Sequence, residues 1–126
     1  HLEDDLLMAN MDARLIIQVL VNLINNAIKY THENSNISLN ARRVEDKILI
    51  EVQDDGNGVL HPDQLFEMFY TENNRGGDTR RGMGLGLSLC KSIIQSHGGT
   101  IWVENVTPHG ACFKFVLDAV EVKLYE

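Results

Sequence analysis

The chain has 126 residues and a mass of 14.2 kDa, which is enough for one domain and too little for two. Its apolar fraction of 44% and charged fraction of 23% are ordinary for a globular protein and exclude a disordered chain. The net charge of −7 argues against nonspecific binding to nucleic acid or to an anionic membrane, but not against a local phosphate site. We therefore expect a single domain over residues 1–126, with no nucleic-acid partner and no membrane contact. Because the chain begins at His1, we expect it to be part of a longer protein.

Apolar periodicity predicts the secondary structure. Asp12 is a good helix N-cap, and apolar residues then recur every three or four positions as far as Tyr30, which is typical of an amphipathic helix. Strict alternation predicts strands, and His97-Gly98-Gly99 predicts a helix stop. In chain order, the predicted elements are a strand over 5–9, a helix over 13–30, strands over 37–41 and 48–54, a helical stretch over 63–69, a helix over 85–96, and strands over 100–104 and 111–117. Adjacent strands pair as hairpins, which favours an α+β sandwich with helices on one face of the sheet.

One face of the first helix presents four polar residues, Asn22, Asn26, Lys29 and Tyr30, at spacings i, i+4, i+7 and i+8. An amide oxygen is a hard neutral ligand for Mg²⁺, which commonly takes one or two protein oxygens and completes its shell with water and phosphate. A lysine one turn further suits a phosphate, and a tyrosine can stack on a base. An ordinary solvated face, with Tyr30 in the core, is an equally open interpretation.

Residues 71–84 form a long stretch without periodicity. One glycine-rich segment precedes this stretch and a second overlaps its end. The first follows a predicted strand and reads Asp54-Asp55-Gly56-Asn57-Gly58; its carboxylate can accept a hydrogen bond from an adenine amine, although a plain Asp-Gly turn is the simpler interpretation. The second, 82–87, opens a helix, where free backbone N–H groups bind phosphate. It lacks the Gly-Lys pair of a P-loop and the third glycine of a dinucleotide fingerprint.

In this order the three motifs resemble the ATP-binding catalytic domain of sensor histidine kinases, in the superfamily shared with DNA gyrase, Hsp90 and MutL. The resemblance covers residues 5–118 and includes 110–113, Gly-Ala-Cys-Phe, which look most like potassium-sensing, KdpD-type kinases. The matching segments are an N box at 18–31, a G1 box at 54–58, an F box at 65–70, a G2 box at 82–87, and the signatures at 97–104 and 110–115. The fold implied is the Bergerat-type two-layer α/β sandwich, with a mixed sheet packed on one face by helices.

The resemblance assigns roles residue by residue. It implies that Asn26 ligates a Mg²⁺ bridging the phosphates of ATP and that Lys29 contacts a phosphate. It also implies that Phe66 and Phe69 anchor the base of a lid over 70–84. In this lid, either Arg80 or Arg81 reaches the γ-phosphate, or both arginines are simply solvated. The nucleotide-binding residues implied are Asn26, Lys29, Tyr30, Asp54, Gly56, Gly58, Phe69, Gly82, Gly84, Leu85 and Gly86. Among these, Asp54 accepts the adenine amine.

Asn22 distinguishes between reactions. Gyrase-like ATPases of the superfamily carry a glutamate general base one turn before the Mg²⁺ asparagine, where this chain has Asn22, which cannot take a proton from water. The substitution argues against efficient hydrolysis and favours transfer of the γ-phosphoryl group, with Asn22 and Asn26 as catalytic residues. Transfer depends mostly on positioning and charge stabilisation. The alternatives are a pseudokinase that binds nucleotide without transfer, and an ATP-driven clamp of the gyrase type.

The resemblance also implies partners. The acceptor is a histidine on the family's separate dimerisation domain, which is missing from this sequence, so we expect the fragment to bind ATP without phosphorylating itself. His32-Glu33 only superficially resembles the start of that domain, because no proline follows where the motif requires one. A response regulator and a location in the cytoplasmic part of a membrane-bound bacterial sensor follow from the same resemblance.

Overall fold

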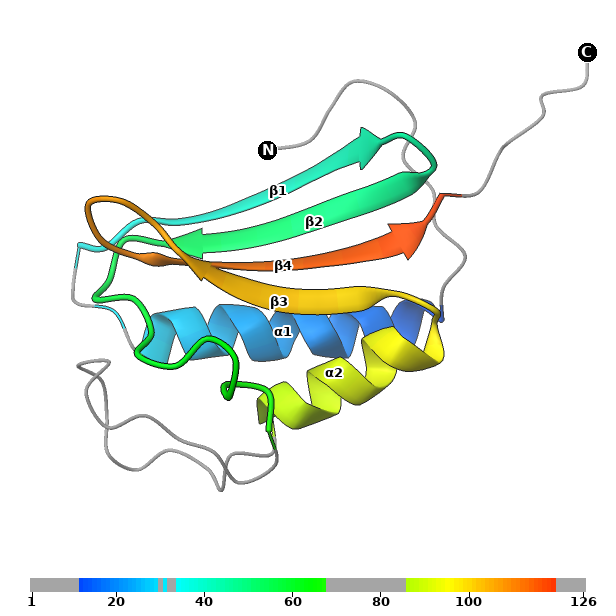
Figure 1. The fold of residues 1–126 in the computed structure, drawn as a ribbon, viewed down its shortest axis with the longest axis horizontal. Coiled ribbons are helices and arrows are strands. Elements are labelled where there is room, and N and C mark those ends of the chain that lie inside the picture. Colours follow the sequence, from blue (N-terminus) through cyan, green and yellow to red (C-terminus); the bar gives the residue numbers. More distant parts are fainter. Residues whose placement is uncertain (1–11, 30, 32–33, 68–85, 120–126) are drawn as a thin grey trace, which may run out of the picture.

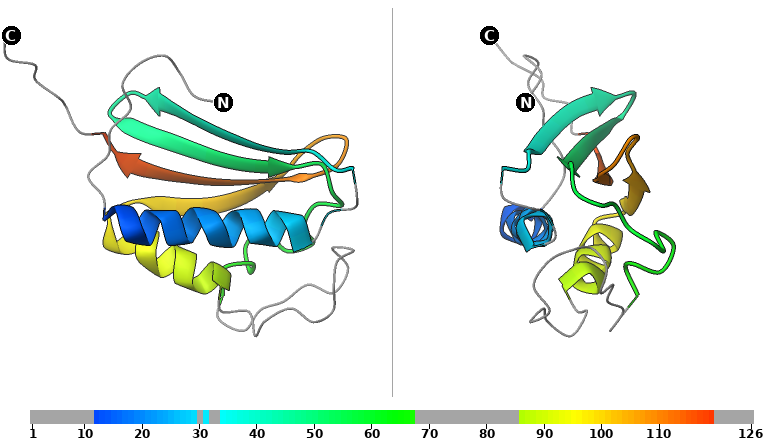
Figure 2. Two further views of the ribbon diagram at one scale, coloured as in Figure 1. Left: turned by 180° about the vertical axis from the view of Figure 1, so that it is seen from behind. Right: turned by 90° about the vertical axis from the view of Figure 1, so that its left-hand side faces the viewer.

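Two helices cover one face of a four-stranded antiparallel sheet in the computed structural model of the chain (Figure 1). The structure describes residues 12–29, 31, 34–67 and 86–119. The elements are α1 (Ala13–Lys29), β1 (Ile37–Val44), β2 (Lys47–Asp54), α2 (Gly86–Ser96), β3 (Thr100–Asn105) and β4 (Ala111–Asp118), and the strand order is β1-β2-β4-β3. Figure 2 shows both helices on the same side of the sheet.

Helix α1 begins where a side chain satisfies one of its free N–H groups. Asp12 Oδ1 accepts a hydrogen bond from the Arg14 N–H at 3.0 Å, which confirms the predicted N-cap. The stripe of α1 that faces the sheet is buried, and it consists of Ile16, Val19, Leu23 and Ala27. The amphipathic period therefore determines which side of the helix meets the core.

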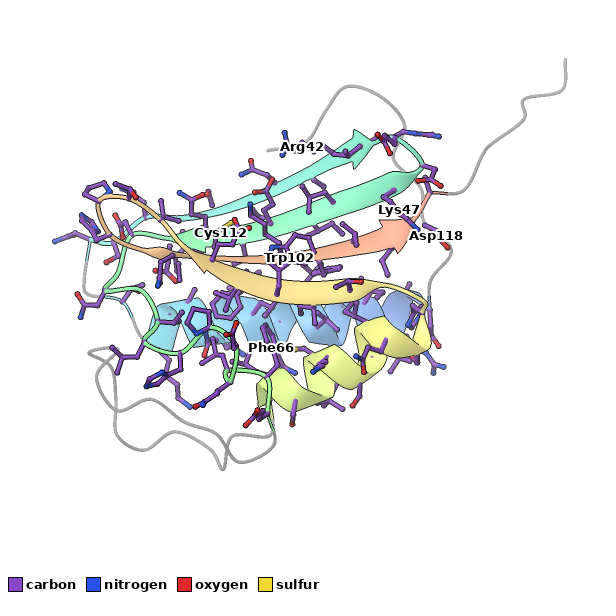
Figure 3. All side chains as sticks on the ribbon, viewed as in Figure 1. Arg42, Lys47, Phe66, Trp102, Cys112 and Asp118 are labelled. Atoms are coloured by element: carbon purple, nitrogen blue, oxygen red, sulfur yellow. The ribbon has the colours of Figure 1, made fainter. Side chains whose placement is uncertain are left out.

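The inner face of the sheet supplies the other half of the core. In the antiparallel register, Phe113 of β4 lies opposite Val52 of β2 and Val103 of β3. All three are at most 6% exposed, because side chains two apart along a strand share a face. The ring of Phe66 meets Phe113 edge-on, with centroids 6.1 Å apart, and so ties the segment after β2 into this core (Figure 3).

Helix α2 ends in a double-glycine stop. Gly98 has φ +75°, and its N–H and that of Gly99 bond back to the carbonyls of Gln95 at 3.0 Å and Ile94 at 2.9 Å. This is the Schellman pattern that glycine favours at a helix end. A Cβ on Gly99 would lie 2.2 Å from the Val116 carbonyl oxygen, so the chain passes close to β4 as it enters β3.

The predicted fold class, helix positions and hairpins are confirmed, with two differences. The three described strand pairings are all antiparallel, so a mixed sheet is not seen in this part of the chain. Residues 62–67 form successive turns, with Gln64 N–H bonded to the His61 carbonyl and Glu67 N–H to that of Gln64, where a helical stretch was predicted. The predicted strand at 5–9 lies outside the described residues. Within those residues, no helix has the length and apolar character needed to cross a membrane.

Candidate functional site

Segments from three separate parts of the sequence lie toward one end of the molecule. Figure 1 shows the last turn of α1, the end of β2 and the loop that follows β2 at the same end, and the first turn of α2 is the part of that helix nearest to them. The β3–β4 turn lies at this end as well. The predicted N box, G1 box and the start of the G2 helix are therefore brought together by the fold.

Asn26 presents a buried amide on α1. Its Nδ2 atom is inaccessible to solvent and has no hydrogen-bond partner among the residues that the structure describes. Buried amides are nearly always bonded, and an exception calls for a reason such as a ligand. An amide can also turn by half a revolution to present its oxygen in place of its nitrogen. Asn26 therefore fits a role as the oxygen ligand of a cation.

Asn22 lies one turn earlier and contacts α2. Its side chain hydrogen-bonds the thiol of Cys90, and the Cys90 Sγ lies 3.8 Å from the Val19 carbonyl oxygen. Burial raises the pKa of the Cys90 thiol to about 11, against the smaller opposing effect of Asn22, so this thiol stays protonated at neutral pH. The sequence did not predict this contact. It joins the N box to the helix that follows the G2 box.

Asp54 is a buried carboxylate at the end of β2. The side chain is 2% exposed and is the buried charged group of the described core. Its Oδ1 accepts hydrogen bonds from the backbone N–H of Gly56 at 2.9 Å and of Ala111 at 3.3 Å. A buried carboxylate needs such donors, because desolvating its charge is costly. The contacts fix the direction of the carboxylate that the sequence assigned to adenine.

Glycines allow the backbone to pack tightly around Asp54. Gly110 has φ +122°, and a Cβ there would lie 2.3 Å from the Asp54 carbonyl oxygen. Gly58 has φ +81°, and a Cβ there would lie 2.6 Å from Asn105 Oδ1. Both positions need glycine for conformation and for space.

Asp55, next to the buried carboxylate, ties the site to two neighbouring turns. Its carboxylate accepts bonds from the Asn36 N–H at 3.0 Å and from Asn36 Nδ2 at 3.4 Å. His109 Nδ1 lies 2.7 Å from the Asp55 carbonyl oxygen. The backbone hydrogen bond from Asn36 is the main cause that lowers the pKa of Asp55. The sequence predicted Asp55 only as the residue between Asp54 and Gly56 in the G1 box. Nothing in the sequence pattern indicated its contacts with Asn36 and His109.

The structure places some predicted site residues and leaves others undescribed. Gly56 is buried and Gly86 opens α2 as an exposed residue with open space where a Cβ would point. Lys29 lies in the last turn of α1, and it makes no ion pair within the described part of the chain. Five predicted nucleotide-binding residues lie outside the described residues: Tyr30, Phe69, Gly82, Gly84 and Leu85. So do the predicted lid, with Arg80 and Arg81, and the pair His32-Glu33.

The arrangement of the helices and the sheet is that of histidine kinase catalytic domains. The catalytic domain of histidine kinase ThkA superposes on 93% of this chain and 76% of its own, with a TM-score of 0.79 and 33% identity. Full-length ShkA, solved in complex with AMPPNP, superposes on 98% of this chain and 25% of its own, with a TM-score of 0.82 and 25% identity. The predicted fold class is thus confirmed by solved structures.

The chain belongs to the family of histidine kinase-, DNA gyrase B- and HSP90-like ATPases, whose pattern matches residues 11–121. The sensor protein KdpD of Clostridium acetobutylicum is 39% identical over 114 residues, covering 89% of this chain and 13% of that protein. The adaptive-response sensory kinase SasA of Crocosphaera subtropica is 46% identical over 110 residues, covering 84% and 28%. The predicted kinship with sensor histidine kinases is confirmed, and a KdpD is among the relatives. The chain spans less than a third of the length of either protein.

Proposed function

We propose that this chain is the catalytic domain of a two-component sensor histidine kinase, with residues 1–126 forming one domain that binds Mg-ATP. The observation that carries the proposal is that one end of the domain holds both a buried carboxylate, Asp54, and the Asn26 amide, whose Nδ2 has no partner among the described residues. The carboxylate supplies an acceptor for the adenine amine, and it discriminates against guanine, which has an oxygen at that position. The complex of ShkA with AMPPNP supports adenine-nucleotide binding at a fold of this kind.

The phosphate end of the site is assigned to α1 and α2. Asn26 holds Mg²⁺ through its amide oxygen, Lys29 offers a cation to a phosphate, and the N-terminus of α2, with Gly86 and the preceding Gly82, Gly84 and Leu85, offers backbone N–H groups. When bound, Mg²⁺ neutralises charge on the phosphates. Tyr30 lines the adenine pocket and Phe69 supports the lid. Gly56 and Gly58 give the loop beneath the nucleotide its path.

The reaction proposed is phosphoryl transfer to a histidine on a separate dimerisation domain. A ring nitrogen of that histidine forms a P–N bond to the γ-phosphorus while the bond to the bridging oxygen breaks, and ADP leaves. Asn22 supports transfer over hydrolysis, since an amide side chain cannot act as a general base toward water. The phosphoryl group then passes to a response regulator, a partner that the complex of ThkA with TrrA exemplifies. We place the domain in the cytoplasm.

Calorimetry of nucleotide binding tests the proposal. We expect the wild-type chain to bind ATP with Mg²⁺ and GTP much more weakly. Asp54→Asn keeps the acceptor for Gly56 but turns an N–H toward the adenine amine. It should weaken ATP binding by about 10- to 100-fold, given about 1.5–3 kcal/mol for a hydrogen bond to a charged group. Asn26→Ala should abolish the Mg²⁺ dependence. The exposed Asn25→Ala is the matched control and should bind like wild type.

Two results would contradict the proposal. A folded chain that binds no ATP is not a catalytic domain, and ATP binding unaffected by Asp54→Asn removes the adenine assignment. Transfer has its own test: radiolabelled ATP should leave no acid-labile phosphate on this chain alone. The label should appear only on an added dimerisation domain that carries the acceptor histidine. Binding without that transfer identifies a pseudokinase.

A further inference from the structure

Asn105, the last residue of β3, bonds both backbone groups of a single residue in the loop after β2. Its Oδ1 accepts a hydrogen bond from the Val59 N–H at 2.7 Å, and its Nδ2 donates one to the Val59 carbonyl at 2.9 Å. An amide side chain offers an acceptor and a donor side by side, in the spacing that these two backbone groups need. The side chain thus makes with Val59 the same pair of hydrogen bonds that a residue of a neighbouring antiparallel strand would make.

The sheet register puts Asn105 in the same row as the buried carboxylate. Asn105 lies opposite Ala111 of β4, and Ala111 lies opposite Asp54 of β2. The chain leaves this row at Asp54, whose Oδ1 holds the Gly56 N–H, and it returns to the row at Val59, where Asn105 holds it. Residues 55–58 are therefore a loop with both ends fastened to one row of the sheet.

Gly58 is fitted against the same amide. A Cβ on Gly58 would lie 2.6 Å from Asn105 Oδ1 and 3.1 Å from the Gly110 carbonyl oxygen, and the residue has φ +81°. Val59 itself is 6% exposed and belongs to the core cluster. The amide therefore fixes the loop on its backbone side while the Val59 side chain fixes it from the core.

We infer that Asn105 is a positioning residue for nucleotide binding, which sets the path of residues 55–58 and thereby the place of Gly56 and Gly58 beside Asp54. The inference rests on the proposed nucleotide site. Losing Asn105 frees the returning end of the loop but leaves the contacts of Asp54 and the strand pairings. Nucleotide affinity should fall while the sheet stays folded.

Amide exchange without nucleotide, together with calorimetry, tests the inference on the whole chain. In Asn105→Ala, the Val59 N–H should exchange about tenfold faster, the equivalent of a lost hydrogen bond, while the amides of β2 and β4 stay protected. ATP should bind about tenfold more weakly, because the loop must be ordered again on binding. Asn40→Ala is the matched control, since Asn40 lies on the outer face of β1, away from the loop, and should change neither value.

Asn105→Asp makes the hold on the loop depend on pH, and ATP affinity should change with pH in the same direction if Asn105 positions the nucleotide site. The ionised carboxylate accepts from the Val59 N–H but repels the Val59 carbonyl, whereas the protonated acid supplies an acceptor and a donor as the amide does. The difference from wild type in exchange of the loop amides, each corrected for its intrinsic rate, should therefore shrink as the pH falls toward about 4, the ordinary range of an aspartate pKa.

Each failure has a distinct meaning. Unchanged exchange at Val59 in Asn105→Ala would show that Asn105 does not hold the loop. Faster exchange with unchanged ATP affinity overturns the positioning role. A wild-type chain that binds no ATP refutes the proposed function instead, while the exchange data still decide whether Asn105 holds the loop.

Discussion

The two ends of the sheet are held by polar side chains in different ways. At the end where β2 finishes, Asp54 is 2% exposed and bonds backbone N–H groups. At the opposite end, Lys47 and Asp118 pair across β2 and β4 with side chains 43% and 59% exposed (Figure 3). Buried polar groups are costly unless satisfied, whereas exposed pairs contribute little either way. The difference is the one expected if the first end binds the nucleotide, as we propose, and the second only closes the sheet.

The largest effect on stability is expected from substituting two glycines, Gly110 beside Asp54 and Gly98 at the end of α2. Gly110 and Gly98 both have positive φ, but a Cβ on Gly110 meets the Asp54 carbonyl oxygen at 2.3 Å, whereas on Gly98 it meets nothing within 4 Å. Gly98→Ala should cost about 1–2 kcal/mol from backbone conformation alone. Gly110→Ala should cost about 3–5 kcal/mol, because backbone atoms must also move. Denaturant unfolding measures both. Equal costs would show that the backbone near Asp54 yields easily.

Substituting Asn26 should change stability by a smaller amount than the glycine substitutions, and it should stabilise the domain. Its buried Nδ2 has no partner in the described part of the chain, so removing the amide relieves an unsatisfied group. Asn26→Ala and the exposed Asn25→Ala both gain helix propensity, about 0.5 kcal/mol each. We expect Asn26→Ala to be at least as stable as Asn25→Ala by thermal unfolding, although only the former impairs ATP binding. If Asn26→Ala is less stable by more than about 1 kcal/mol, its amide has a structural partner and the ligand assignment fails.

Some of this site could be predicted from sequence because its determinants are local. The helical period placed Asn22 and Asn26 on one face of α1, and the Asp-x-Gly-x-Gly pattern located Asp54 at a strand end. Asn105 and Val59 are 46 residues apart, and their contact depends on the register of β3 on β4. Asn22 and Cys90 likewise meet only through the packing of two helices. Alternating polarity at a strand end does not encode such partners.

The smallest expected effect is on how stability depends on pH. One end of the sheet should lose stability in acid and the other in alkali. The pKa of Asp55 is lowered, mainly by its bond from Asn36, so the stability it adds is present above its ordinary pKa of 3.8 and is lost as the pH falls below that value. The pKa of Lys47 is raised by its bond to Asp118, so its contribution is present below 10.5 and is lost as the pH rises past that value.

Two variants resolve these windows in thermal unfolding measured across pH. Asp55→Asn should lower the melting temperature slightly at neutral pH, and the deficit should vanish in acid, where wild-type Asp55 also becomes neutral. Lys47→Met should show a small deficit at neutral pH that vanishes only in alkali. Both deficits should shrink in high salt, because exposed charges are screened. If the deficit of Asp55→Asn is constant through the acid range, the bond to Asn36 does not depend on charge. The end of the sheet proposed to bind nucleotide would then differ from the other end in burial alone.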